Sequence, residues 1–159
     1  MKFIPFFLYL LLIGMHQVIW REMTSIYGAS INLPALIVLA VALYKSELAA
    51  VWFGFVVGIV LAVNPGMLGW QALALALLGL LAYHAREKLN LESLYTKLLL
   101  VFAGILLHNI SASIIQAGLK FYQLWLNILT GSIYTAVIAL IFFLFKDGII
   151  TVKKIKSIF

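Results

Sequence analysis

The chain has 159 residues, of which 65% are hydrophobic and 10% are charged, and its mean hydropathy is +1.16. Soluble domains carry about 25% charged residues, so the composition excludes an ordinary water-soluble domain and indicates a chain that lies mostly in a lipid bilayer. The absence of cysteine excludes disulfides and cysteine nucleophiles. The net charge of +6 comes from basic residues at the ends of apolar runs, so nucleic acid is not an expected partner.

Apolar runs bounded by charged or turn-forming residues predict an all-α integral membrane protein with six transmembrane helices in one polytopic domain, residues 1–159. A spanning helix needs about 20 apolar residues, or fewer where the protein thins the membrane. The second and third runs are shorter than this length. The expected spans are 3–20, 31–44, 48–63, 67–84, 95–116 and 122–145.

The distribution of basic residues predicts how these spans are oriented. With six spans and both termini in the cytoplasm, two basic residues lie outside, Arg21 and Lys120. Nine lie inside: Lys2, Lys45, Arg86, Lys88, Lys97, Lys146, Lys153, Lys154 and Lys156. Fusing the second and third runs into one span would weaken this positive-inside bias, so we expect a multi-pass protein of the cytoplasmic membrane. The basic tail after Lys146 could also lie on anionic membrane lipid.

Groups that carry enzyme chemistry are scarce inside the expected spans. All five acidic residues lie in loops or at span ends, and the three histidines lie on three different spans with no second ligand one turn away. Paired carboxylates, metal-ligand clusters and glycine-rich phosphate loops do not appear. We therefore expect no catalytic residues, no metal site and no cofactor, and we expect that the protein is not an enzyme.

Small residues recur every fourth position on the third span and form a ridge, Ala50, Gly54, Gly58 and Ala62. The fourth span has a similar stripe that includes Ala72 and Ala76. Small side chains let helices approach closely, and close packing is a main attraction between helices in lipid. We expect the two spans to form a tight hairpin, with a partner's transmembrane helix or a second copy of the chain, in a homo-oligomer, as the alternative occupants of the ridge.

The polar residues inside the expected spans concentrate on the fifth one. Polar groups facing lipid are costly, so they should point inward and form hydrogen bonds between helices. The alternative is an outward-opening pocket for a small molecule. The residues of this predicted polar cluster are His16, Gln17, Gln71, His108, Asn109, Ser113 and Gln116.

A group of turn-forming residues separates the third and fourth spans. Pro65 and Gly66 supply the fixed and the permissive backbone angles of a tight turn, and Trp70 fits an anchor at the membrane surface. We expect Asn64, Pro65, Gly66, Met67 and Trp70 to form the outer tip of the hairpin. Asn64, Met67 and Trp70 could there contact a partner's helix where it leaves the membrane.

The middle of the chain resembles the bacterial rod shape-determining MreD family. The resemblance is carried by the run LPAL at 33–36, the run ALYKSELAAVWFGFVVG at 42–58, the run GMLGWQAL at 66–73 and the basic cluster YHAREK at 83–88. It covers residues 31 to about 100. The chain departs from the family pattern at Ala35 and before the turn, where acidic residues are common.

The resemblance implies a non-enzymatic scaffold of the cell-wall elongation machinery in the bacterial inner membrane. Such proteins bind the bitopic MreC protein, which connects them to MreB filaments, the polymerase RodA and a class B penicillin-binding protein. The fold implied is similar to the six-helix S component of energy-coupling-factor transporters. The alternative function is therefore a vitamin-binding S component, although the first span lacks the Ala-x-x-x-Ala surface that such a protein uses for docking.

Overall fold

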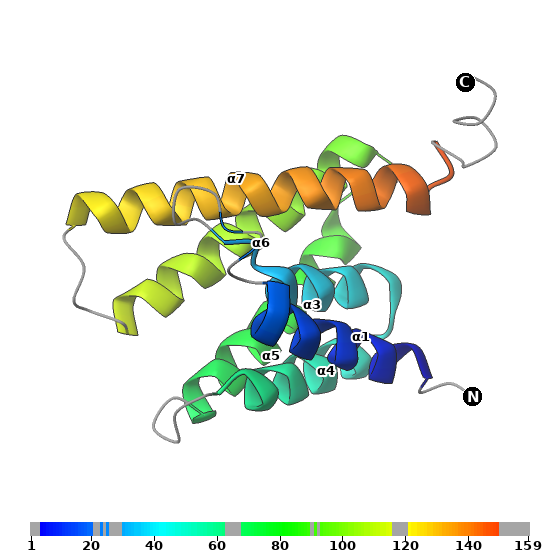
Figure 1. The fold of residues 1–159 in the computed structure, drawn as a ribbon. Coiled ribbons are helices and arrows are strands. Elements are labelled where there is room, and N and C mark those ends of the chain that lie inside the picture. The colour runs from blue at the N-terminus through cyan, green and yellow to red at the C-terminus, as the bar shows by residue number, and fades with distance from the viewer. Residues whose placement is uncertain are drawn as a thin grey trace.

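The computed structural model describes residues 4–20, 23, 25, 30–62, 68–89, 91, 93–115 and 121–149. Over these residues the chain is helical and contains no strand, which confirms the expected all-α class. The elements in chain order are α1 (Ile4–Met15) with its π-helical continuation η1 (His16–Trp20), α3 (Leu33–Tyr44), α4 (Glu47–Leu61), α5 (Leu68–Lys88), α6 (Leu94–Ile115) and α7 (Phe121–Lys146) (Figure 1).

The helix ends differ from the expected span ends for identifiable reasons. Helix α3 begins at Leu33 because the side chain of Asn32 caps it, accepting a hydrogen bond from the backbone N–H of Ala35 at 3.2 Å. Helix α5 continues to Lys88, four residues past the expected span end at residue 84. An apolar run ends where the side chains become polar, whereas a helix ends where its backbone hydrogen bonds stop. A spanning helix can therefore extend beyond the hydrocarbon core of the membrane.

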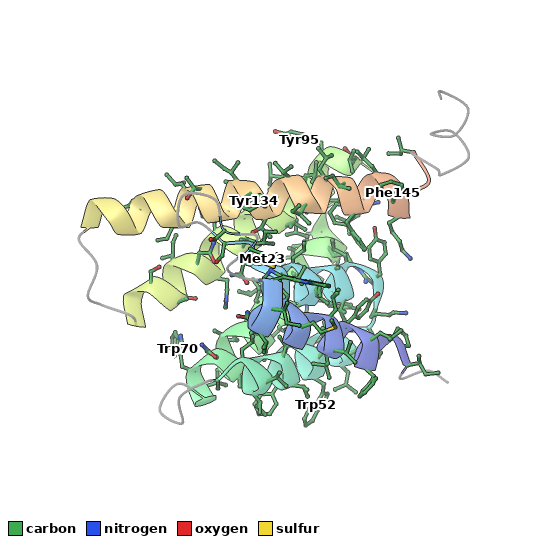
Figure 2. The ribbon with its side chains drawn as sticks, in the orientation of Figure 1. Met23, Trp52, Trp70, Tyr95, Tyr134 and Phe145 are labelled. Atoms are coloured by element: carbon green, nitrogen blue, oxygen red, sulfur yellow. The ribbon has the colours of Figure 1, made fainter. Side chains whose placement is uncertain are left out.

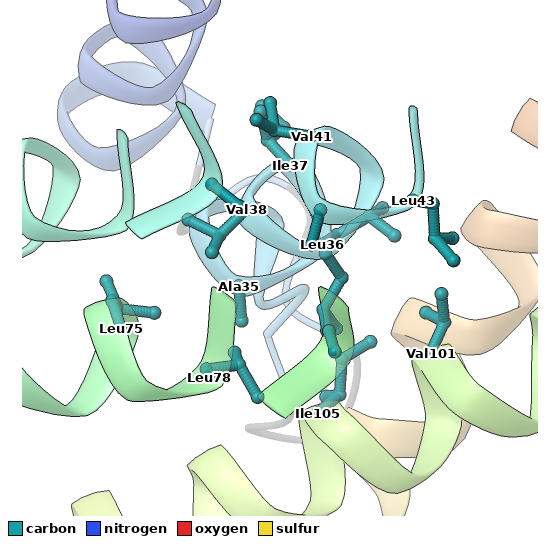
Figure 3. Close-up of a cluster of buried hydrophobic side chains, with 14 of the residues drawn as sticks. Ala35, Leu36, Ile37, Val38, Val41, Leu43, Leu75, Leu78, Val101 and Ile105 are labelled. Atoms are coloured by element: carbon teal, nitrogen blue, oxygen red, sulfur yellow. The ribbon is translucent and has the colours of Figure 1, made fainter. Parts of the chain in front are cut away.

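Helix α3 forms the centre of the molecule. Its residues from Pro34 to Leu39 and from Val41 to Leu43 are all buried. Helices α4, α5 and α6 pack around it, and the core close-up shows its side chains meeting those of α5 and α6 (Figure 3). Helix α4 contacts α1, α3 and α5, whereas α7 contacts α3 and α6, so α4 and α7 lie on opposite sides of α3 (Figure 1).

The exterior of the molecule is apolar along its helices. Exposed large side chains recur every fourth residue on three helices: Leu48, Trp52, Val56 and Val60 on α4; Leu73, Leu77 and Leu81 on α5; Leu129, Ile133, Val137, Ile141 and Phe145 on α7. Trp52 and Tyr95 project from opposite sides of the molecule (Figure 2). Continuous apolar stripes of this length are unusual on a water-soluble monomer.

Within the described residues, two helices are long and apolar enough to cross a membrane. These are Leu94–Ser113 within α6 and Ile128–Lys146 within α7. Three further apolar helices are shorter: Ile4–Trp20, Leu33–Tyr44 and Glu47–Leu61. The described part of the chain therefore has the composition and exterior of a membrane protein, with helices of unequal length.

Candidate functional site: interhelical contacts and a buried polar network

Helices α4 and α5 approach each other backbone to backbone. A Cβ atom added at Gly58 would lie 2.5 Å from both the backbone nitrogen of Ala72 and the carbonyl oxygen of Gln71. At Gly54 it would meet the carbonyl group of Leu75, and at Gly79 it would lie 2.8 Å from the carbonyl oxygen of Ala50. No side chain larger than hydrogen fits at these positions, because the obstructing atoms belong to the backbone.

The ridge predicted on the third span therefore faces a helix of the same chain. Ala50 and Ala72 are buried in this contact, and the Cα atom of Ala76 would lie 3.1 Å from a Cβ atom at Gly54. Ala62 does not extend the ridge, because it lies just past the end of α4 as the C-cap residue with extended backbone angles. Since α5 fills the ridge, a partner helix has no room on this face of α4.

The expected hairpin turn is described only at one residue. Asn64, Pro65, Gly66 and Met67 lie outside the described residues. Trp70 lies in the first turn of α5 with 48% of its surface exposed. Its side chain points outward at the end of α5 that adjoins this turn (Figure 2). Trp70, the described residue of the predicted outer corner, is thus exposed at the surface.

A polar network joins the start of α3 to α6 and α7. The side-chain amide of Asn32 donates to Oδ1 of Asn109 at 2.7 Å, and the amide of Asn109 donates to Oγ of Ser132 at 3.0 Å. The backbone N–H of Asn32 donates to Oγ1 of Thr135 at 3.0 Å. Both hydroxyls also donate to the backbone of their own helix, Ser132 to Ile128 and Thr135 to Gly131, each at 2.7 Å. These bonds orient each hydroxyl as an acceptor for an asparagine group.

Asn109 thus forms hydrogen bonds between helices, as expected from the first of the two interpretations of the predicted polar cluster. His16 is buried in η1, and Gln17 is half-buried beside it. Gln71 and His108 each bury one polar atom, Oε1 and Nδ1, that has no hydrogen-bond partner. Ser113 is half-buried on α6, and Gln116 lies outside the described residues.

Three members of the network were absent from the predicted cluster: Asn32, Ser132 and Thr135. Asn32 had a recognisable signal, because asparagine followed closely by proline is typical of a helix start. Ser132 and Thr135 are single hydroxyl residues in an apolar run and carry no comparable signal. Only the register between α6 and α7 shows that they face the asparagines.

Charged groups gather at the opposite end of the bundle. Nη1 of Arg86 donates to the carbonyl oxygens of Ala42, Leu43 and Lys45 at 3.1, 3.0 and 2.9 Å. These carbonyls belong to the last turn of α3 and to its C-cap residue Lys45, where the helix dipole is negative, so the guanidinium both satisfies and neutralises that helix end. Arg86 also lies over the ring of Tyr83, 4.8 Å from its centre.

A second contact at the same end joins three segments that are distant in sequence. Nζ of Lys97 at the start of α6 lies 2.5 Å from Oδ2 of Asp147, which follows α7, and the hydroxyl of Tyr44 donates to the other oxygen of Asp147 at 3.3 Å. The side chains of Lys97 and Asp147 are only 12% and 21% exposed. This cluster and Arg86 bring the charged groups of α5, of α6 and of the residue after α7 to the end of α3, as an up-and-down topology produces.

Comparisons with known proteins found no match for this chain. No family model matches the chain, and no curated protein and no solved structure matches it. The described residues contain no group of three or more histidine, cysteine or acidic residues that could hold a metal ion.

Proposed function

We propose that the chain is a six-span inner-membrane scaffold of the bacterial cell-wall elongation machinery, with no catalytic activity of its own, and that it binds the bitopic MreC protein. The observation that carries the membrane part is the arrangement of polarity: apolar stripes cover the outside, while Asn109 and its hydrogen-bond partners lie between helices. Such an arrangement suits a lipid environment, where polar groups must be satisfied internally. The role in elongation rests on the resemblance of residues 31 to about 100 to the MreD family.

In this proposal, the contacts between helices limit the faces of the molecule to which MreC can bind. The ridge of Gly54 and Gly58 is occupied by α5, so the transmembrane helix of MreC docks on another face. The outer corner beside Trp70 is the favoured place, because an exposed tryptophan at a span end can contact both a helix and the segment that follows it outside. Tryptophan is among the residues that most often dominate protein interfaces. MreB, RodA and a class B penicillin-binding protein are then reached through MreC.

Co-purification of the chain with MreC from a detergent or nanodisc preparation tests this function. Trp70→Ala should reduce the apparent affinity at least about tenfold, since truncating an interfacial tryptophan commonly costs about 2 kcal/mol. The matched control is Trp52→Ala, because Trp52 is 59% exposed on α4 but lies toward the other end of the hairpin. Absence of any stable complex with MreC would refute the scaffold proposal, and equal effects of the two variants would refute the docking place.

A vitamin-binding S component remains a second candidate function because of one observation. The polar network and the buried Nδ1 of His108 put hydrogen-bonding groups inside the bundle, away from the charged end. A native mass spectrum of the purified protein distinguishes the two functions. A bound small molecule that is lost in Asn109→Leu would favour the S component, whereas a spectrum of the bare chain together with MreC binding favours the scaffold.

A further inference from the structure

The helices differ in length from one side of the molecule to the other. Helix α4 has 15 residues and spans about 22 Å, whereas α7 has 26 residues and spans about 39 Å. The apolar run of α4 cannot be much longer, because Asn64 follows Val63 directly and Lys45 precedes Glu47. Its span therefore falls short of a hydrocarbon core about 30 Å thick. Tilting α4 would shorten its projection further and cannot correct the mismatch.

The exposed apolar stripes of α4 and α7 allow positions on the two helices to be compared at equal distances from the charged end of the bundle. Both begin beside a charged residue at the same end of the bundle: Leu48 follows Glu47, and Phe145 precedes Lys146. Twelve residues along each stripe, about 18 Å away, lie Val60 on α4 and Ile133 on α7. Val60 is next to the last residue of its helix, but α7 continues for another twelve residues beyond Ile133.

The polar network lies at this same level. Tyr44 at one end of α3 contacts Asp147, and Asn32 at the other end contacts Thr135, so the twelve-residue α3 covers about 18 Å from the charged end. Counting along α7, Thr135 lies eleven residues before Lys146, about 16 Å. Asn32 and Asn109 are only half-buried. Helix α3 therefore begins at the level where the stripe of α4 ends, and both helices are shorter than the hydrocarbon thickness of an undeformed bilayer.

We infer that the face of α4 is a lipid-binding surface for a locally thinned bilayer, and that the protein holds a bilayer of normal thickness against α7. The occupant is phospholipid whose outer-leaflet headgroups descend beside α4 to the level of Val60. The inference rests on the membrane insertion in the proposed function and not on the role in elongation. A protein of this shape would favour regions of membrane that are thin or are being deformed.

Spin labels on single cysteines test this directly, since the chain has no native cysteine. Val60→Cys and Ile133→Cys are compared in dioleoylphosphatidylcholine vesicles, with Val56→Cys and Val137→Cys as controls one turn closer to the charged end. The side chains at all four positions are exposed, so labels there leave the packing intact. Accessibility to oxygen reports hydrocarbon, and accessibility to a water-soluble nickel chelate reports the headgroup region.

The label at residue 60 should show several-fold greater access to nickel than the label at residue 133, while both control labels remain rich in oxygen. In thinner dimyristoleoylphosphatidylcholine vesicles, nickel access should rise at residue 133 and stay constant at residue 60. Equal oxygen-rich signals at residues 60 and 133, or a parallel rise at both in thin vesicles, would overturn the inference. Nickel-rich signals at both controls would instead refute membrane insertion, whereas loss of MreC binding alone would refute only the elongation role.

Discussion

Helices α4 and α5 meet backbone to backbone, whereas α6 and α7 are joined by side-chain hydrogen bonds. In the first hairpin Gly54, Gly58 and Gly79 have no side chain, so the backbones of the two helices meet directly at these positions. In the second, Asn109 of α6 bonds to Ser132 of α7 and to Asn32 before α3. Lipid tails are as apolar as leucine, so the hydrophobic effect does not draw such helices together in a bilayer. Close packing and hydrogen bonds between helices are then the main attractions, and the two hairpins use one each.

The two contacts differ in how much they should tolerate change. A backbone contact fails when any atom is added, because the facing atoms cannot rotate away. A hydrogen bond between side chains can be lost without a steric clash, and its net contribution in membrane proteins averages only about 0.6 kcal/mol. The α4–α5 hairpin should therefore be the more sensitive one, and four substitutions rank the contacts of the molecule.

The largest effect is expected for Gly58→Leu. The new side chain would collide with the backbone of Gln71 and Ala72, so the hairpin must separate or the helix must shift. We expect the free energy of unfolding to fall by at least about 3 kcal/mol, measured by circular dichroism during titration with sodium dodecyl sulfate. Gly69→Leu is the control, because nothing lies within 4 Å of a Cβ atom there. Equal stability of the two variants would show that the close approach of α4 and α5 is not essential.

A smaller loss is expected for Arg86→Met, which keeps most of the side-chain length but removes the donors. Three carbonyl oxygens at the end of α3 lose their shared partner, and hydrogen bonds from charged groups contribute about 1.5–3 kcal/mol. We expect a loss of about 2 kcal/mol in the same titration. Lys88→Met removes an exposed charge two residues further along α5 and should have little effect. A similar loss in both variants would assign the effect to net charge instead of the helix end.

These contacts differ in how far they could be predicted from the sequence. The close-packing ridge of α4 follows from one local pattern, small residues at every fourth position, which requires no knowledge of the other helices. The gathering of Lys45, Arg86, Lys97 and Lys146 at one end follows from the positions of charges along the chain. Both features depend on the spacing of residue types along the chain, and spacing is visible in a sequence.

Features that depend on the pairing of segments could not be predicted in the same way. Ser132 and Thr135 face the asparagines only because of the register between α6 and α7. The sequence also left three occupants possible for the ridge of Gly54 and Gly58, because a ridge is equally suited to a helix of the same chain, a second copy or a partner. Ala62 was wrongly placed on that ridge, since the helix ends one residue before it.

An intermediate effect is expected for Asn109→Leu, which tests the α6–α7 side of the comparison. Leucine has a similar shape, so the change removes the hydrogen bonds to Asn32 and Ser132 without a large cavity. We expect a loss of about 1 kcal/mol, in the range measured for interhelical bonds in membranes. Ser111→Ala is the control, because the hydroxyl of Ser111 donates within its own helix to the carbonyl of His108. A loss larger than that of Gly58→Leu would reverse the ranking of the two hairpins.

The smallest effect is expected for Asp147→Asn, which weakens the contact at the charged end of α6 and α7. Asparagine keeps the shape and can still accept from Tyr44, but it removes the charge that pairs with Lys97. Ion pairs near a water surface contribute about 0–1 kcal/mol and are screened by salt. The variant should therefore lose less than about 1 kcal/mol at low salt, and the difference from the wild type should shrink at high salt. Glu87→Gln is the control, because its carboxylate lies 3.6 Å from His84 in a contact whose two side chains are about half exposed, and it should lose less than Asp147→Asn. A loss that does not depend on salt would mean that the contact between Lys97 and Asp147 is shielded from solvent ions, and α6 and α7 would then be held at this end by a buried polar contact, as they are at Asn109 and Ser132.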